Sequence, residues 1–168
     1  MPQEWTEKKA RVAESYESLL RPIWPNLELP RISQPRDLSE GEIEVFRLIA
    51  DEYLHFFIVF VAGYDRFGGV GSFHWGMCKR LEAPTKPMLE LDYRGAFKTT
   101  AGSICAPLWG AAKDPGSYDH LLVVSDLPLG KDILETQAKQ IENNQILRTL
   151  YPWMRPLKSD WSGTSRSL

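Results

Sequence analysis

The sequence predicts an α+β fold, in which an antiparallel sheet of three to four strands packs against a long central helix and N- and C-terminal helices. Three observations predict it. A segment with helical periodicity, 40–62, lies mid-chain, and alternating apolar and polar residues follow it over 70–126. The expected strands also follow one another without a helix between them, which is typical of antiparallel sheets. The length of 168 residues suits one compact domain, 1–168.

The chain begins with a predicted helix over 6–21, where Thr6 is a suitable N-cap. Four apolar residues recur at helical spacing: Val12, Tyr16, Leu19 and Ile23. Prolines end this helix and fill the next segment, 22–38. Because this segment also carries apolar residues, we expect a strap on the protein surface rather than a free linker.

The central helix is predicted over 40–62. Ser39 and Glu42 form a capping-box pattern in front of it, and Gly63 follows its end. Its apolar residues alternate at spacings of three and four: Ile43, Phe46, Ala50, Tyr53, Phe57 and Phe60. The second half, 54–62, is apolar on every face, so we expect it to form the axis of the core. A strand is the alternative for this half, because phenylalanine, isoleucine and valine also favour strands.

The sheet is predicted within 70–126. Apolar residues alternate with other residues over 73–77, and apolar with charged residues over 88–95. The segments 98–109 and 120–125 complete the expected strands.

A helix over 130–151 is predicted to close the body of the domain. Pro152 stops it, and the remaining residues, 152–168, form an arm with two tryptophans among polar and basic residues.

Composition excludes several classes of protein. The formal net charge of −2 leaves no basic excess for nucleic-acid binding. The longest apolar run, 56–62, is too short to span a bilayer. The N-terminal residues lack the apolar stretch of a secretory signal, and two cysteines are too few for a secreted disulfide scaffold. We therefore expect a protein of the cytoplasm or an organellar matrix that is not secreted.

The histidines are the best candidates for chemistry. Glu52 and His55 are three residues apart, so a continuous helix would place them on one face, where the carboxylate could orient the imidazole for acid–base catalysis. His74 and His120 are the other candidate catalytic residues. No cofactor is predicted: a mononuclear metal site built from His55, His74 and His120 is chemically sensible, but nothing in their spacing demands it. The alternative is a structural role, in which His55 is not catalytic and only caps the polar stripe of a core helix.

Aromatic side chains predict a pocket for an apolar small molecule. The candidate substrate-binding residues are Phe56, Phe60, Phe73, Trp75, Tyr93 and Trp109. A plain hydrophobic core is the alternative. The glycines of 68–71 predict a flexible turn. If the turn has a function, we expect it to act as a lid over the pocket.

Two functions follow, and whether the chain is an enzyme stays open. The first is a small-molecule-binding enzyme that performs cofactor-independent acid–base chemistry, of the isomerase, dehydratase or cyclase type, on an apolar or aromatic substrate. The second is a non-catalytic accessory subunit that docks into a larger assembly, or into a homo-oligomer, through the strap and the C-terminal arm. Tryptophan is a favoured anchor in such interfaces.

Overall fold

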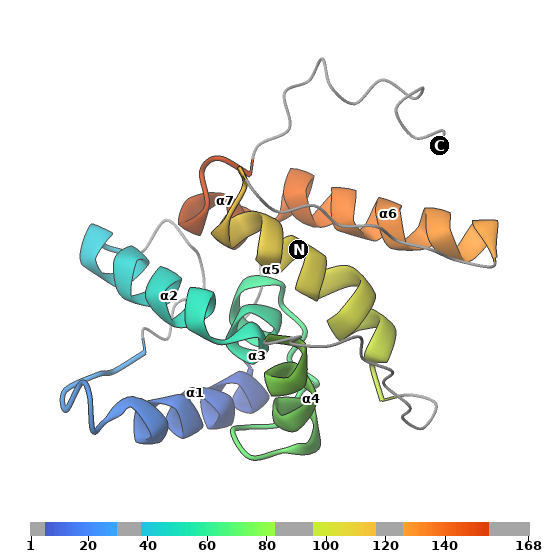
Figure 1. Cartoon of the computed structure of the whole chain (residues 1–168). Coiled ribbons are helices and arrows are strands. Elements are labelled where there is room, and N and C mark those ends of the chain that lie inside the picture. The colour runs from blue at the N-terminus through green and yellow to red at the C-terminus, as the bar shows by residue number, and fades with distance from the viewer. Residues whose placement is uncertain (1–5, 30–37, 83–95, 117–125, 155–168) are drawn as a thin grey trace.

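Helices make up every regular element that the structure describes (Figure 1). The computed structural model describes residues 6–29, 38–82, 96–116 and 126–154. None of these residues lies in a strand, so the predicted α+β fold with an antiparallel sheet is wrong for this part of the chain. The predicted strands 88–95 and 120–125 lie outside the described residues.

The segment predicted as the first strand is helix α4, Phe73–Glu82. Its inward residues are His74, Met77, Cys78 and Leu81, which are buried or half-buried. Their spacings of three, one and three define one face of a helix. The short alternation of Phe73, Trp75 and Met77 fits this helix as well as a strand, which explains the error.

The segment predicted as a further strand, 98–109, is helical too. A π-helical stretch, η3 (Thr99–Cys105), continues into α5 (Ala106–Lys113). Four of the buried residues in these two helical stretches lie at helical spacings: Ala101, Cys105, Leu108 and Ala112. Most of these side chains are small, so the hydrophobic pattern that would have revealed the helix is weak.

The first helix, α1, spans Glu7–Leu20, close to the expected range. Thr6 caps it by accepting a hydrogen bond from the Lys9 amide. The described part of the strap lies against α1, because Leu29 is buried and its amide donates to the Glu17 carboxylate at 2.8 Å.

The central segment is helical but not one helix. α2 spans Glu40–Glu52, and after a single extended residue, Tyr53, the chain continues as α3 (Leu54–Phe56) and the π-helical η2 (Phe57–Val61). Tyr53 has φ −124° and ψ 107°. The preference for helix over strand in the second half is confirmed over 54–61, whereas the continuous helix is wrong. Gly63, with φ 84°, ends the second piece.

The capping box at the start of α2 is present as predicted. The Ser39 Oγ accepts from the Glu42 amide, and the Ser39 amide donates to the Glu42 carboxylate at 2.8 Å. The Ser39 hydroxyl also donates to the Glu42 carboxylate, at 2.6 Å, and this hydrogen bond together with that from the Ser39 amide lowers the pKa of Glu42.

Replacing Ser39 with alanine should lower the free energy of unfolding by about 1 kcal/mol, because it removes one side of this cap. Urea denaturation measures the change. Ser18→Ala is the matched control, since Ser18 is an exposed residue inside α1 where alanine favours the helix. Equal stability of the two variants would contradict the prediction.

The predicted C-terminal helix, 130–151, is also two helices. α6 spans Leu127–Asn143 and α7 spans Gln145–Leu150, with Asn144 extended between them. The Asn144 Nδ2 donates to the Val61 carbonyl at 2.7 Å, and its Oδ1 accepts from the Leu147 amide at 3.0 Å. One side chain therefore caps α7 and ties this break to the end of η2.

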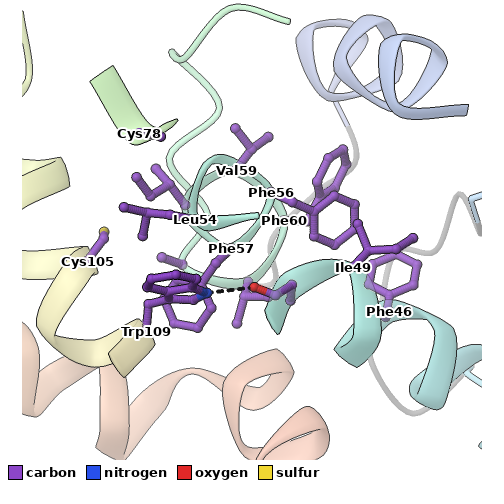
Figure 2. Packing of buried hydrophobic residues seen from close by; sticks show 14 of the residues in the cluster. Phe46, Ile49, Leu54, Phe56, Phe57, Val59, Phe60, Cys78, Cys105 and Trp109 are labelled. Atoms are coloured by element: carbon purple, nitrogen blue, oxygen red, sulfur yellow. Dashed lines mark hydrogen bonds between the residues drawn. The ribbon is translucent and has the colours of Figure 1, made fainter. Parts of the chain in front are cut away.

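The helical segment 54–61 is the axis of the core, as its uniformly apolar sequence predicted. No side chain from Leu54 to Val61 is more than 2% exposed. Helices α1, α2, α4 and α5 lie around it, and α6 runs across the side opposite α1 (Figure 1). Figure 2 shows the large apolar side chains that converge on this axis. Within the described ranges, no helix has both the length and the apolar character needed to cross a bilayer.

Candidate functional site

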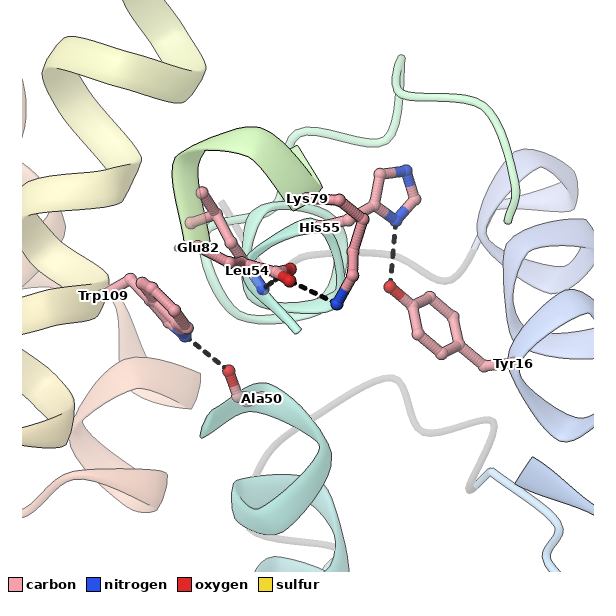
Figure 3. A network of polar contacts seen from close by, with 7 residues as sticks. All are labelled: Tyr16, Ala50, Leu54, His55, Lys79, Glu82 and Trp109. Atoms are coloured by element: carbon pink, nitrogen blue, oxygen red, sulfur yellow. Dashed lines mark hydrogen bonds and ion pairs between the residues drawn. The ribbon is translucent and has the colours of Figure 1, made fainter. Parts of the chain in front are cut away.

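The break at Tyr53 positions the candidate site. A helix end leaves backbone groups without intrahelical partners, and here side chains from later helices supply them. The Leu54 amide donates to Glu82 Oε1 of α4 at 2.9 Å, and Trp109 Nε1 of α5 donates to the Ala50 carbonyl at 2.7 Å (Figure 3). The corner between α2 and α3 is thus held from both sides, and it turns His55 inward.

His55 is completely buried and hydrogen-bonded to a tyrosine. The distance between its Nδ1 and the hydroxyl oxygen of Tyr16 is 3.1 Å, and both side chains are 0% exposed. Tyr16 comes from α1, 39 residues earlier in the chain. Such a contact between distant segments orients the imidazole ring within the core.

The second ring nitrogen of His55 is the unusual atom. Figure 3 shows that Nε2 points away from Tyr16, and Nε2 forms no hydrogen bond with the described residues. A buried polar atom without a partner lowers stability by about 1–3 kcal/mol, so it needs an explanation.

Burial also sets the charge of this ring. It lowers the pKa of His55 to about 4, with a further lowering by His74, whereas the Gly68 backbone acts in the opposite direction. The Gly68 backbone therefore interacts with the ring, although its geometry does not make a hydrogen bond with Nε2. At neutral pH the imidazole is uncharged.

Aromatic rings form the surroundings of His55. Trp75 and Phe67 lie edge-on to the imidazole, with centroid distances of 5.7 and 6.2 Å. Trp75 also stacks on Tyr53 at 5.6 Å, and the Lys79 ammonium lies 4.8 Å from the Tyr53 ring centre. Lys79 forms an ion pair with Glu82, the same carboxylate that caps α3.

The glycine-rich segment between Gly63 and Ser72 brings Phe67 to this site. Gly63 and Gly71 have φ of 84° and 85°, which other residues rarely adopt. Between them, Phe67 is only 2% exposed. A Cβ on Gly69 would lie 2.6 Å from Ser15 Oγ, so the segment fits closely against α1.

A polar contact holds the start of the same segment. The Thr6 hydroxyl donates to Asp65 Oδ2 at 3.1 Å. The Asp65 carboxylate also acts on Lys9, which is 4% exposed: burial lowers the pKa of Lys9, and Asp65 opposes this. The glycine-rich segment is therefore attached to α1 through both packing and charge.

The predicted catalytic residues are only partly brought together. His74 lies on α4 with its ring 4.6 Å from Phe67, the ring that also contacts His55. Glu52 is exposed at the end of α2, and no hydrogen bond or ion pair joins it to His55. His120 lies outside the described residues.

Among the predicted substrate-binding residues that the structure describes, Trp75 is the one in ring contact with His55. Phe56 and Phe60 pack against each other and against Phe46 in the core. Phe73 is 43% exposed, and Trp109 is engaged at the corner. Tyr93 lies outside the described residues.

Sequence reasoning missed Tyr16 as a site residue. It was assigned only to the apolar row of the first helix. A tyrosine on a buried apolar face normally needs a hydrogen-bond partner for its hydroxyl. This rule could have indicated that Tyr16 contacts a polar side chain in the core.

Metal and thiol chemistry find no further support among the described residues. No three histidine, cysteine, aspartate or glutamate side chains of this part of the chain gather in a way that could hold a metal ion. Cys78 and Cys105 are free and buried, and burial raises the pKa of Cys78 to about 12. Such thiols are poor nucleophiles.

Comparison with known proteins gives no family: no family model, curated protein or solved structure matches this chain.

The Tyr16–His55 contact predicts strong coupling between the two residues. Tyr16→Phe leaves Nδ1 without its partner and should lower stability by about 1–3 kcal/mol. His55→Leu leaves the hydroxyl without its His55 partner but also removes the unpaired Nε2, so its loss should be smaller. The double variant should lose less than the two single losses combined, because neither polar group is then left buried alone. Urea denaturation of all four proteins measures this, and additive losses would contradict it.

Proposed function

We propose that this protein binds an apolar small molecule beside His55, and that the His55 imidazole performs cofactor-independent acid–base chemistry on it. The buried Nε2 of His55 carries the proposal. A polar atom of a ligand would provide its hydrogen bond, while Trp75 and Phe67 would contact the apolar part. Binding sites for small molecules combine such apolar walls with few polar groups.

Tyr16 would act as the positioning residue in this site. Its hydrogen bond fixes the imidazole plane, so that Nε2 keeps one direction. The neutral imidazole has one donor and one acceptor nitrogen, which suits proton transfer without a metal or cofactor. Isomerisation, dehydration and cyclisation are reaction types that proton transfer alone can catalyse, without a metal or cofactor.

A ligand would reach Nε2 by displacement of the glycine-rich segment. Both Nε2 and Phe67 are buried, and Phe67 is carried between two glycines with positive φ. Rotation about these glycines would lift Phe67 away from His55.

Equilibrium dialysis with three small aromatic compounds tests the binding. Acetophenone, α-methylstyrene and indole have similar size and different polar groups. We expect saturable binding of at least one, with a Kd of about 1 mM or tighter, and loss of that binding in Tyr16→Phe/His55→Leu. If the unmodified protein and the double variant bind every compound equally, the proposal is overturned.

The same two proteins test the chemistry. Exchange of the acetophenone methyl hydrogens for deuterium in D2O requires acid–base catalysis, and NMR records its rate. We expect faster exchange with the unmodified protein than with the double variant. Equal rates would leave binding without catalysis and would overturn the enzymatic part.

Exposed apolar residues at the end of α1 favour a second function, that of an accessory subunit. Ile23 is 68% exposed and Trp24 is 38% exposed, at the start of the strap. We propose a partner protein as the occupant of this surface. Trp153, at the start of the arm, instead donates its indole N–H to the Ala112 carbonyl of its own chain at 3.0 Å.

Sedimentation of the purified protein, alone and after Ile23→Glu, tests the self-association version of this function. Concentration-dependent assembly that Ile23→Glu abolishes would support it. A monomer at every concentration would exclude a homo-oligomer formed through this surface.

A further inference from the structure

We infer that the place now filled by the Phe67 ring is the ligand site itself, and that it takes compounds with a single six-membered aromatic ring. Phe67 is then a competitor of the ligand within the chain. The inference rests on the proposed function, because it names the ligand class of the same site and the step that controls entry. It follows from the way in which Phe67 is buried.

Phe67 is buried alone in its part of the chain. Over 63–76 it is the only buried residue, at 2% exposure. Arg66 before it is exposed, and two glycines, Gly68 and Gly69, follow it directly. A segment with a single buried side chain has few apolar contacts to break when it opens, which is typical of the parts of a protein that move.

Three rings surround Phe67, and we call the place between them the Phe67 seat. The rings are those of His55, His74 and Phe97, with centroid distances to Phe67 of 6.2, 4.6 and 5.8 Å. A small aromatic ligand in the seat would therefore meet two imidazoles and one phenyl ring. Imidazoles are the groups that the proposed acid–base chemistry requires.

The backbone of Phe97 indicates that this wall of the seat is held in place at a cost. Phe97 has φ 57°, and among the described residues it is the only one other than glycine with a positive φ. A Cβ disfavours this conformation, and residues held in it gather at active sites and ligand clamps. The Phe97 carbonyl also accepts from the Ala101 amide at 2.9 Å, at the start of the η3 rod. A fixed wall limits the seat to a ligand about the size of the Phe67 ring.

A hinge beside the seat controls entry of the ligand. The Ser72 amide donates to the Gly69 carbonyl at 3.1 Å and closes the turn that contains Gly71, whose φ is 85°. Rotation at Gly71 would open this turn and lift Phe67. Once the ligand has entered, the lifted ring covers its outer side. The apparent affinity is lower than the intrinsic affinity by the fraction of protein that is open.

Phe67→Ala measures this competition. In equilibrium dialysis, acetophenone should bind the variant about 10-fold more tightly than the unmodified protein, as expected if about 10% of the protein is open. Phe67→Leu, which leaves a smaller cavity, should lie between the two. Phe46→Ala is the matched control, because it removes a phenylalanine that is 3% exposed from α2, which contributes no ring to the seat. Equal gains in the two alanine variants would show only a cavity effect and would overturn the inference.

Hydrogen exchange on the unmodified full chain is the second measurement. We expect saturating acetophenone to speed amide exchange within 63–72, because Phe67 leaves its seat and the hydrogen bond of the Ser72 amide opens. A ligand that binds elsewhere would leave this segment unchanged or protect it. Either of these results would overturn the inference.

Phe97→Ala tests the size limit. 2-Acetonaphthone carries the acetyl group of acetophenone on a system with one more ring. We expect the unmodified protein to prefer acetophenone, and Phe97→Ala to shift the ratio of the two Kd values by about 10-fold toward 2-acetonaphthone. Phe73→Ala is the control, since Phe73 also contacts His74, at 5.4 Å, but is 43% exposed. An unchanged ratio in Phe97→Ala would overturn the restriction to one ring.

The outcomes separate the two proposals. If acetophenone binds the unmodified protein but binds Phe67→Ala no more tightly, the binding function stands and the inference is wrong. If neither protein binds any of the compounds, both proposals fail. If only Phe67→Ala binds, the seat is supported as a site that Phe67 keeps closed, and the binding function fails for the unmodified protein.

Discussion

Replacing Trp109 with alanine is expected to lower the free energy of unfolding by about 3–5 kcal/mol. The side chain is 8% exposed, so its removal leaves a large cavity beside η3 and α2. It also removes the indole N–H that donates to the Ala50 carbonyl at 2.7 Å, in the last turn of α2. For a domain whose total stability is about 5–15 kcal/mol, this is a large fraction.

Two matched variants separate packing from hydrogen bonding. Trp109→Phe keeps an aromatic ring and should lower stability by about 1–3 kcal/mol, mainly through the unpaired carbonyl. Trp153 also donates its indole N–H to a backbone carbonyl, but it is 47% exposed. Trp153→Ala should therefore have a much smaller effect. Urea denaturation followed by circular dichroism measures all three, and similar losses for both alanine variants would show that Trp109 does not hold the corner.

Acidification from pH 7 to pH 4 is expected to lower stability by about 3 kcal/mol through His55 alone. The pKa is about 4 in the folded protein against an ordinary 6.5, and each pH unit between them corresponds to about 1.4 kcal/mol. Burial is the main cause. Between these values the unfolded chain binds a proton that the folded protein excludes. Stability therefore falls as the pH decreases from 6.5 to 4, and this contribution is constant above pH 6.5.

Comparison with Tyr16→Phe/His55→Leu isolates the contribution of His55. Carboxylates also titrate in this range, but they are present in both proteins. The difference in unfolding free energy between the two proteins should change by about 3 kcal/mol between pH 7 and pH 4. His74→Gln is the control, since it keeps the Tyr16–His55 pair. Parallel pH profiles for the unmodified protein and the double variant would refute the prediction.

Periodicity and capping were sufficient to predict part of the fold. The helix α1, the capping box at Ser39 and the buried axis 54–61 all follow from local patterns. The sheet was predicted wrongly because short alternations, such as that over 73–77, fit a helix as well. In 98–109 the buried face is made mainly of small residues, which give little hydrophobic contrast.

The break at Tyr53 could not be predicted from neighbouring residues. No glycine or proline lies near it, and the groups that stabilise it, Glu82 and Trp109, lie 28 and 59 residues beyond their backbone partners. The pairing of Glu52 with His55 assumed a continuous helix, so it depended on the same missing information. His55 itself was found because the apolar run around it was evident, whereas its partner Tyr16 lies on another helix.

The distance in sequence between the corner and its caps has a consequence for synthesis of the chain. While a ribosome is still translating α4 and α5, neither Glu82 nor Trp109 is available to the emerging central segment. During that interval Tyr53 lacks the contacts that favour its extended conformation, and α2 can continue into α3 as one rod. The nascent protein would then have to bend this rod, and bury its apolar half, only after Trp109 has left the exit tunnel.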